Sequence, residues 1–147
     1  MISVEHPHVA TVRTLIDGVH RRLDGGREGR HGDPMSADVA VHFDPGGTHE
    51  LAGTYVGIEG RRRMTGLLLE LSGGTIRPRV HDIVGGVDWA VMTFTITAAV
   101  GPEHFNWIAT SEFRFAGALI VEDWIRPAPR REVERFIDHG RSLLRSK

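Results

Sequence analysis

The sequence predicts an α+β fold in which helices pack on one face of a curved antiparallel sheet. Apolar residues recur at helical spacing in some stretches and alternate with period two in others. Along the chain these stretches follow the order helix, short strand, helix and then a run of long strands joined by short turns. This order is typical of α+β proteins, and the concave side of such a sheet offers a pocket.

The length and composition are those of one ordinary soluble domain. The chain has 147 residues, of which 40% are hydrophobic and 25% are charged. This size is sufficient to bury a real core. Because the sequence contains no internal repeat, low-complexity tract or linker, we expect residues 1–147 to form a single domain.

Charge and cysteine content exclude several classes of function. The formal net charge is −1, so no overall field attracts the chain to nucleic acid or to an acidic membrane, and we expect neither partner. Without cysteine the chain has no disulfide, no zinc–thiolate site and no thiol nucleophile. No apolar run approaches the ~20 residues of a membrane span, and the N-terminal region carries charges unlike those of a signal peptide. We therefore expect a cytoplasmic protein.

Three stretches are predicted to be helices: residues 8–24, 57–71 and 130–145. Their apolar residues recur every three or four positions, which places them on one side of a helix. Gly25-Gly26 ends the first helix, and Ser72-Gly73-Gly74 ends the second. The three apolar stripes are Val9, Val12, Ile16, Val19 and Leu23; Met64, Leu67, Leu68 and Leu71; and Val133, Phe136, Ile137 and Leu144.

The other regular stretches predict strands. Residues 37–43 form a short strand, and the Asp-Pro-Gly-Gly sequence at 44–47 then turns the chain. A further strand is expected over residues 75–84. Residues 87–100 and the two strands within 104–126 form a meander of three long antiparallel strands.

Glycine and proline mark where regular structure is interrupted. Residues 25–34 hold four glycines and a proline, so a loop is predicted there. Pro78 favours an edge strand or a bulge, and Pro127 and Pro129 are predicted to break the last strand.

The outward face of the meander is rich in threonine. Thr93, Thr95 and Thr97 lie opposite the apolar face of the long strand, and Thr110 and Ile108 belong to the neighbouring strand. A convex sheet face of this kind could bind a second copy of the chain, so we expect a homodimer.

The best indication of a functional site lies at residues 104–126. From Phe105 to Phe115 aromatic and small residues alternate with polar ones, and Ser111 is the only hydroxyl on the apolar face. Asp123 on the next strand shares a predicted face with Leu119, Val121 and Ile125. A buried hydroxyl must find a hydrogen-bond partner, in the protein or in a ligand. A serine and a carboxylate on apolar faces of neighbouring strands therefore indicate a site.

The order of elements and several short stretches resemble the nuclear-transport-factor-2-like (NTF2-like) superfamily. The stretches are ADVAVHFDPGG, LAGTYVGIEG, LELSGGT, and FRF followed by IVEDW. They are most similar to the branch of ketosteroid-isomerase-like and SnoaL-like polyketide cyclase proteins, over about residues 6–126. The resemblance implies a cone in which the helices cover the concave face of the sheet and enclose a pocket. The C-terminal helix at 130–145 would close that pocket or pack on a partner chain.

The resemblance also implies where catalytic residues lie. Asp44 matches the base that ketosteroid isomerases place in an Asp-Pro dipeptide after the first strand, and a shift of one residue would bring His42 into the pocket instead. The donor tyrosine on the first helix falls near His20, with Val19 as the alternative. Ser111 replaces a protonated acid. The aspartate that cyclases carry on the last strand is Ile125 here, and an acid occurs two residues earlier, at Asp123.

Each of these residues has a structural alternative. Asp44 could cap the turn, His42 and His20 could be exposed, and Ser111 could bond the backbone. Asp123 could pair with Arg79 or Arg114 in place of acting as base or acid. Five aromatic residues are expected either to touch a ligand or to form core, with Tyr55 interpreted as packing: Trp107, Phe105, Phe113, Tyr55 and Trp89.

Metal and phosphate sites are not expected. His81-Asp82 could begin a metal site, but no third ligand follows at a suggestive spacing. Arg61, Arg62 and Arg63 are interpreted as a solvated helix face in preference to a phosphate-binding patch.

The sequence and the resemblance together favour a small enzyme that transfers a proton on a hydrophobic carbonyl compound without a cofactor. Asp44 or Asp123 would act as base, and His20, His42 or Ser111 would hold the oxyanion. A ligand-binding domain without chemistry is the alternative, and a third possibility is an accessory dimer whose pocket is filled by its own side chains.

Overall fold

The computed structural model describes residues 5–25, 34–44 and 51–146. Most of the predicted loop at 25–34 and of the turn at 44–47 lies outside the described residues. The other predicted elements are present, and β2 is an addition, because a four-residue strand is too short to show a periodic pattern. The elements are α1 (Pro7–Leu23), β1 (Met35–Phe43), β2 (Gly53–Val56), α2 (Gly57–Leu71), β3 (Arg77–Gly85), β4 (Trp89–Val100), β5 (Glu103–Ala116), β6 (Leu119–Ala128) and α3 (Arg130–Arg145).

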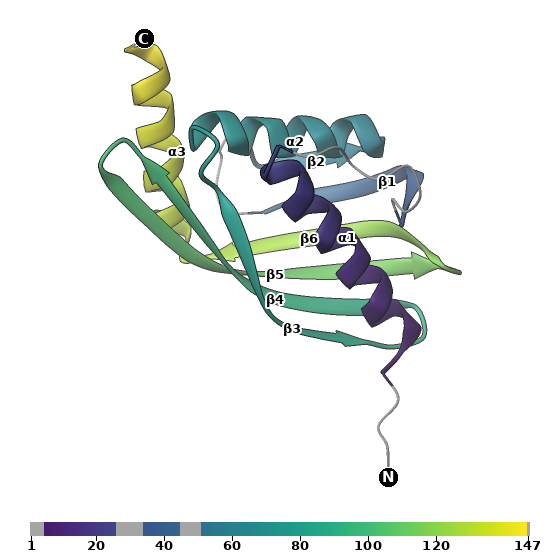
Figure 1. Cartoon of the computed structure of the whole chain (residues 1–147). Helices are drawn as coiled ribbons and strands as arrows, with labels where there is room; N and C mark the ends of the chain where they lie inside the picture. The colour runs from purple at the N-terminus through teal and green to yellow at the C-terminus, as the bar shows by residue number, and fades with distance from the viewer. Residues whose placement is uncertain (1–4, 26–33, 45–50, 147) are drawn as a thin grey trace.

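The strands form one curved sheet in the order β2-β1-β6-β5-β4-β3 (Figure 1). The predicted α+β class and the meander from β3 to β6 are confirmed. One pair departs from the predicted antiparallel sheet, because β1 runs parallel to β6. Parallel neighbours need a long crossover connection, and here α2 and the rest of the meander provide it.

The helices cover the concave face and one end of the sheet (Figure 1). α1 lies across β3 and β4, and α2 packs on β1 and β2. α3 contacts α2 and the strands β4 to β6. Gly140 permits this close approach, because a Cβ there would lie 2.7 Å from the carbonyl oxygen of Leu71.

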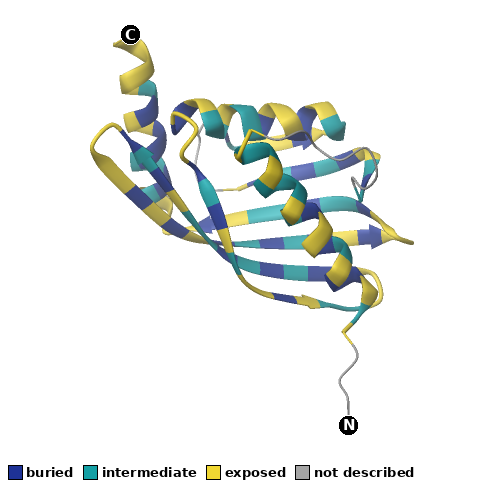
Figure 2. Cartoon of the chain, viewed as in Figure 1, coloured by how far each residue is buried: buried dark blue, intermediate teal, exposed yellow. Residues whose placement is uncertain are grey.

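Burial alternates along β5 as the sequence predicts (Figure 2). The inward side chains from Phe105 to Phe115 are all buried, including Ser111, while their neighbours face outward. The same pattern holds in β4, where Ala90, Met92 and Phe94 are buried. The core therefore lies between these two strands and the helices.

The face predicted for β6 is correct at Asp123 and Ile125 but wrong at its first residues. The β5–β6 register shifts between Arg114 and Phe115, so that Val121 has no partner and Ile120 faces inward in its place. Leu119 is 46% exposed. A bulge of this kind reverses the parity of the strand, which no alternation pattern reveals.

β6 also continues beyond the residue where proline was predicted to break it. Pro127 pairs with Ala109 of β5. On its other side the last strand partner is Phe43, opposite Ile125, so the missing N–H of Pro127 faces no strand.

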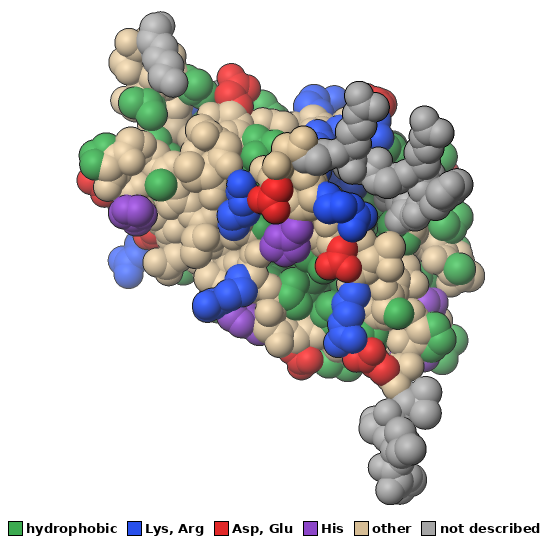
Figure 3. Space-filling view, in the orientation of Figure 1, with side chains coloured by type: hydrophobic (Ala, Val, Ile, Leu, Met, Phe, Trp, Pro, Cys, Tyr) green, Lys and Arg blue, Asp and Glu red, His purple; other side chains and the backbone are tan. Residues whose placement is uncertain are grey.

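Charged side chains of both signs are interspersed on the face that carries α1 (Figure 3). On α1 itself, Arg13, Asp17 and Arg21 are exposed. None of the helices among the described residues is long and apolar enough to cross a membrane.

The homodimer predicted through the outer face of the sheet stays a prediction. Ile108 is 62% exposed at the centre of that face, among Thr95, Thr110 and their neighbours. If this face is the dimer contact, Ile108→Arg places a charge in it, and we expect a monomer in light scattering at micromolar concentration. Val87→Arg, at the exposed turn after β3, is the control. A monomeric wild-type protein, or a dimer that survives Ile108→Arg, contradicts the prediction.

Candidate functional site

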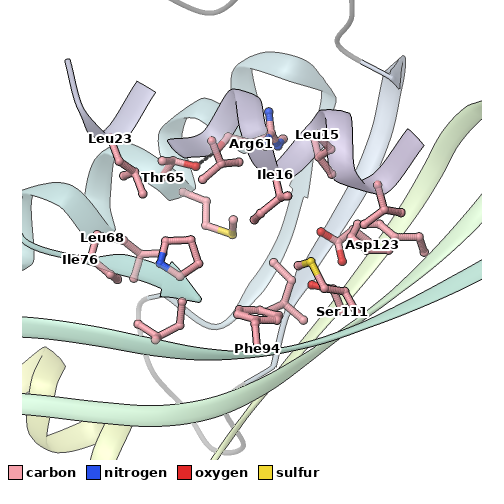
Figure 4. Close-up of a pocket in the computed structure, with 18 residues that line it drawn as sticks. Leu15, Ile16, Leu23, Arg61, Thr65, Leu68, Ile76, Phe94, Ser111 and Asp123 are labelled. Atoms are coloured by element: carbon pink, nitrogen blue, oxygen red, sulfur yellow. Dashed lines mark hydrogen bonds between the residues drawn. The ribbon is translucent and has the colours of Figure 1, made fainter. Parts of the chain in front are cut away.

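An apolar cavity lies between α1, α2 and the concave face of the sheet (Figure 4). Its volume is about 130 Å³. We call it the proximal chamber. Its lining residues are Val12, Leu15, Ile16, Val19, Leu23, Arg61, Met64, Thr65, Leu68, Ile76, Pro78, Met92, Phe94, Ile96, Ser111, Phe113, Asp123 and Ile125.

Few polar side chains line this chamber, and one pair of them, Ser111 and Asp123, comes from neighbouring strands. Ser111 of β5 is in register with Ile125 of β6, so Asp123 lies two residues along the same inward face. The hydroxyl and the carboxylate lie side by side in the chamber (Figure 4). Both side chains are buried, Ser111 at 2% exposure and Asp123 at 5%. The two residues that the sequence places on apolar faces of neighbouring strands are therefore brought together.

The carboxyl group of Asp123 is harder to ionise than that of an ordinary aspartate. Burial raises the pKa of Asp123 to about 7, while the Ser111 hydrogen bond and the positive charge of Arg61 oppose that rise. Among the residues that the structure describes, Oδ1 of Asp123 has no hydrogen-bond partner. Near neutral pH this group is divided between acid and base forms, which suits it to accept a proton and to return it.

Arg61 is the functional candidate that the sequence interpretation missed. Arg62 and Arg63 are exposed, as the interpretation of a solvated face requires. Arg61 is only 8% exposed and lines the proximal chamber. The available signal was spacing, because Arg61 lies three residues before Met64 and seven before Leu68, on the apolar stripe of α2.

Three residues expected in the pocket do not line it. Asp44 is exposed at the end of β1, where its backbone N–H donates to the carbonyl oxygen of Ile125 at 2.9 Å. His20 is a half-buried residue of α1 that does not line the chamber, whereas Val19, the alternative at this position, does. His42 faces outward, because Val41 and Phe43 on either side of it face the core.

On the outer face His42 belongs to a network of its own. Its Nδ1 lies 2.9 Å from Oγ1 of Thr54, and its Nε2 lies 3.0 Å from Oε2 of Glu122. The imidazole stacks on the Trp124 ring with a centroid separation of 3.8 Å. Its contacts therefore hold β2, β1 and β6 together outside the cavity.

The aromatic candidates divide into two groups. Phe113 lines the proximal chamber, and Trp107 lines a second cavity of about 100 Å³, which we call the distal chamber. Phe105 packs under α3, with Phe136 at a ring separation of 5.7 Å. Tyr55 donates its hydroxyl to the carbonyl oxygen of Leu51 at 2.9 Å, in keeping with a packing role.

Trp89 is the remaining aromatic candidate, and it lies away from both chambers. It is 36% exposed, and its ring covers Gly86 at the turn between β3 and β4. In the described part of the chain, no three His, Asp or Glu side chains are placed to hold a metal ion.

The comparisons with known proteins identify the fold. No family model and no curated protein sequence matches the chain. An NTF2-like protein of unknown function from Burkholderia pseudomallei matches with a TM-score of 0.69 and 20% identity, covering 87% of this chain and 95% of that one. The chain has the NTF2-like fold.

Two proposed polyketide cyclases share this NTF2-like fold. A SnoaL-like protein from Jannaschia matches with a TM-score of 0.63 and 18% identity, covering 87% of this chain and 90% of that one. IdmH from Streptomyces antibioticus matches with a TM-score of 0.65 and 17% identity, covering 90% of this chain and 99% of that one. At these identities the likeness is one of fold, and the resemblance noted in the sequence is confirmed at that level.

The buried carboxylate predicts an unusual dependence of stability on pH. Between about pH 4 and about pH 7 folded Asp123 keeps a proton that the unfolded chain releases. The free energy of unfolding therefore falls as pH rises through this range. Asp123→Asn removes this effect. We expect the stability of the variant relative to wild type to increase from about pH 4 to about pH 8, by at most roughly 4 kcal/mol.

Chemical denaturation at several pH values measures this difference. Asp138→Asn, an exposed change on α3, is the control and should show no such trend. A relative stability of Asp123→Asn that is the same at all pH values contradicts the raised pKa.

Proposed function

We propose that this protein is a small enzyme that transfers a proton on a hydrophobic carbonyl compound and so isomerises or cyclises it. The observation that carries the proposal is the buried carboxylate of Asp123, with its free Oδ1, beside the Ser111 hydroxyl in an apolar cavity. Proton transfer next to a carbonyl requires a base and a donor for the enolate oxygen, and these two side chains supply both.

In the proposed reaction Asp123 acts first as base. It takes the proton from the carbon next to the substrate carbonyl, and the C–H electron pair moves to form the enolate. Asp123 is then a neutral acid. For an isomerisation it returns the same proton to a different carbon; for a cyclisation the enolate carbon attacks a second carbonyl carbon and Asp123 protonates the resulting alkoxide. A pKa near 7 favours both directions of transfer.

Ser111 is the proposed oxyanion donor. In the resting site its hydroxyl interacts with the Asp123 carboxylate. When Asp123 takes the proton it loses its negative charge and becomes a weaker acceptor, so the hydroxyl is released to donate to the enolate oxygen. A well-placed donor in a dry cavity contributes roughly 3 kcal/mol. The guanidinium of Arg61 adds a positive charge on the same chamber.

The fold neighbours support the substrate class. Two of them are proposed polyketide cyclases, and polyketides are carbonyl-rich. The chamber walls are predominantly apolar, which favours a hydrophobic compound over a sugar or a nucleotide.

A ligand-binding domain without chemistry is the second candidate. The positions of Asp44 and His20 favour it, because two residues that the resemblance marks as catalytic lie outside the cavity. The same cavity would then hold a hydrophobic ligand unchanged.

Exchange of carbon-bound protons separates these candidates. β-Tetralone, a ketone with acidic protons next to its carbonyl, is incubated in D₂O, and the loss of those proton signals is followed by NMR. We expect wild-type protein to accelerate exchange, Asp123→Asn to return it to the buffer rate, and Ser111→Ala to slow it about a hundredfold.

Asp44→Asn is the matched control, because it changes the exposed rival carboxylate. It should retain full exchange. Loss of exchange in Asp44→Asn with retention in Asp123→Asn refutes the assignment of the base. Binding of β-tetralone without any acceleration by the wild type favours the second candidate.

The pH dependence of the same exchange tests the role of Arg61. Below about pH 7 we expect kcat/KM to rise about tenfold per pH unit and then to level off, because only ionised Asp123 accepts a proton. Arg61 lowers the pKa of Asp123, so Arg61→Met should move the midpoint to higher pH. A midpoint that stays in place, or moves down, contradicts this coupling.

A further inference from the structure

The distal chamber adjoins the proximal chamber and shares much of its wall. The shared residues come from α2, from the segment before β3 and from the inward faces of β4 and β6. They are Met64, Leu68, Ile76, Phe94, Ile96 and Ile125. Two cavities that share this much wall are parts of one space divided by side chains.

The two chambers differ in polarity. The distal chamber adds Phe43, Trp107, Ala109 and Pro127 to the shared wall, and none of its lining residues carries a charged or hydroxyl-bearing side chain. Asp123, Ser111, Arg61 and Thr65 all lie in the proximal chamber. A ligand that occupies both chambers therefore needs its polar group at one end and hydrocarbon at the other.

The far wall of the distal chamber is fixed. Trp107 is 4% exposed, and its ring lies 5.1 Å from the ring of Phe136, a fully buried residue of α3. Because α3 holds this aromatic pair from behind, Trp107 cannot retreat without loss of packing. This wall ends the space that a ligand can occupy on the side of α3.

Volume decides how large that ligand is. An apolar cavity of about 150 Å³ holds one benzene molecule. The chambers, at about 130 Å³ and about 100 Å³, each approach the size of one ring. Met64 is the unbranched side chain between them, and its three rotatable bonds allow it to turn aside for a ligand that spans both.

We propose that the ligand is a compound of two fused rings with a carbonyl at one end. The carbonyl lies beside Asp123 and Ser111, and the second ring occupies the distal chamber against Trp107. Ala109, the smallest side chain that lines only this chamber, leaves room for the second ring. This inference rests on the proposed function for the position of the carbonyl.

Filling the distal chamber tests the proposal. Ala109→Leu adds bulk to that chamber alone. We expect it to weaken the binding of β-tetralone, which has two fused rings, at least about tenfold in calorimetry, and to leave cyclohexanone, which has one ring, within about twofold. Ala116→Leu, the same substitution at an exposed position of the same strand, should leave both affinities unchanged.

Tryptophan fluorescence reports the location of the second ring without adding bulk to the distal chamber. β-Tetralone should alter the emission of wild-type protein and of Trp124→Phe, and this change should disappear in Trp107→Phe. Cyclohexanone should leave the Trp107 emission unchanged. This measurement decides the question if Ala109→Leu fails to fold.

Three results overturn the proposal: no binding of β-tetralone to wild-type protein at millimolar concentration, equal effects of Ala109→Leu on both ketones, or equal Trp107 responses to both. The outcome is separate from that of the proposed function, because binding is measured without turnover. Selective loss of β-tetralone binding in Ala109→Leu, with no proton exchange by the wild type, supports the two-ring site and refutes the enzyme. Proton exchange by the wild type, with no effect of Ala109→Leu on β-tetralone binding, supports the enzyme and refutes the two-ring site.

Discussion

One carboxylate held among apolar side chains is the constraint on which the rest of the site depends. Burial of Asp123 disfavours its ionised form, and only one hydroxyl and one buried arginine oppose that effect. Its inward direction follows from the strand, because Asp123, Ile125 and Pro127 occupy every second position of β6 and therefore share its inward face. The side chain cannot turn to solvent without taking its neighbours out of the core.

The arrangement of the helices creates the space around this carboxylate. α1 lies over β3 and β4, α2 lies over β1 and β2, and the hollow between them opens onto β5 and β6, which carry Ser111 and Asp123 (Figure 1, Figure 4). α3 then closes the end of the cone by packing against Trp107 and against α2. A site on strands of a packed sheet is held more rigidly than one on loops, which suits reactions that depend on position.

The sequence predicts the parts of this site that local periodicity controls. Ser111 and Asp123 stand out because each breaks an apolar alternation, and the structure brings them together. Positions that depend on register are not predictable in this way: the bulge at Val121 reverses the start of β6, and the direction of His42 follows from pairing with β2 and β6. The buried position of Arg61 was not predicted, because the run of three arginines was interpreted as one solvated face. Its two neighbours are indeed exposed, but the helical phase of Arg61 matches the cavity side of α2.

The free-energy cost of Asp123 favours chemistry over passive binding. A cavity that only holds a hydrophobic ligand is more stable with an apolar or amide side chain at this position, because no charge is then desolvated. Folded proteins keep such destabilising groups mainly where activity needs them. Arg61 is a second buried charge in this chamber, and apart from Asp123, Arg61, Ser111 and Thr65 the lining side chains are apolar. The destabilising group is also the group best suited to move a proton at neutral pH, and this coincidence is the strongest physical support for the proposed enzyme.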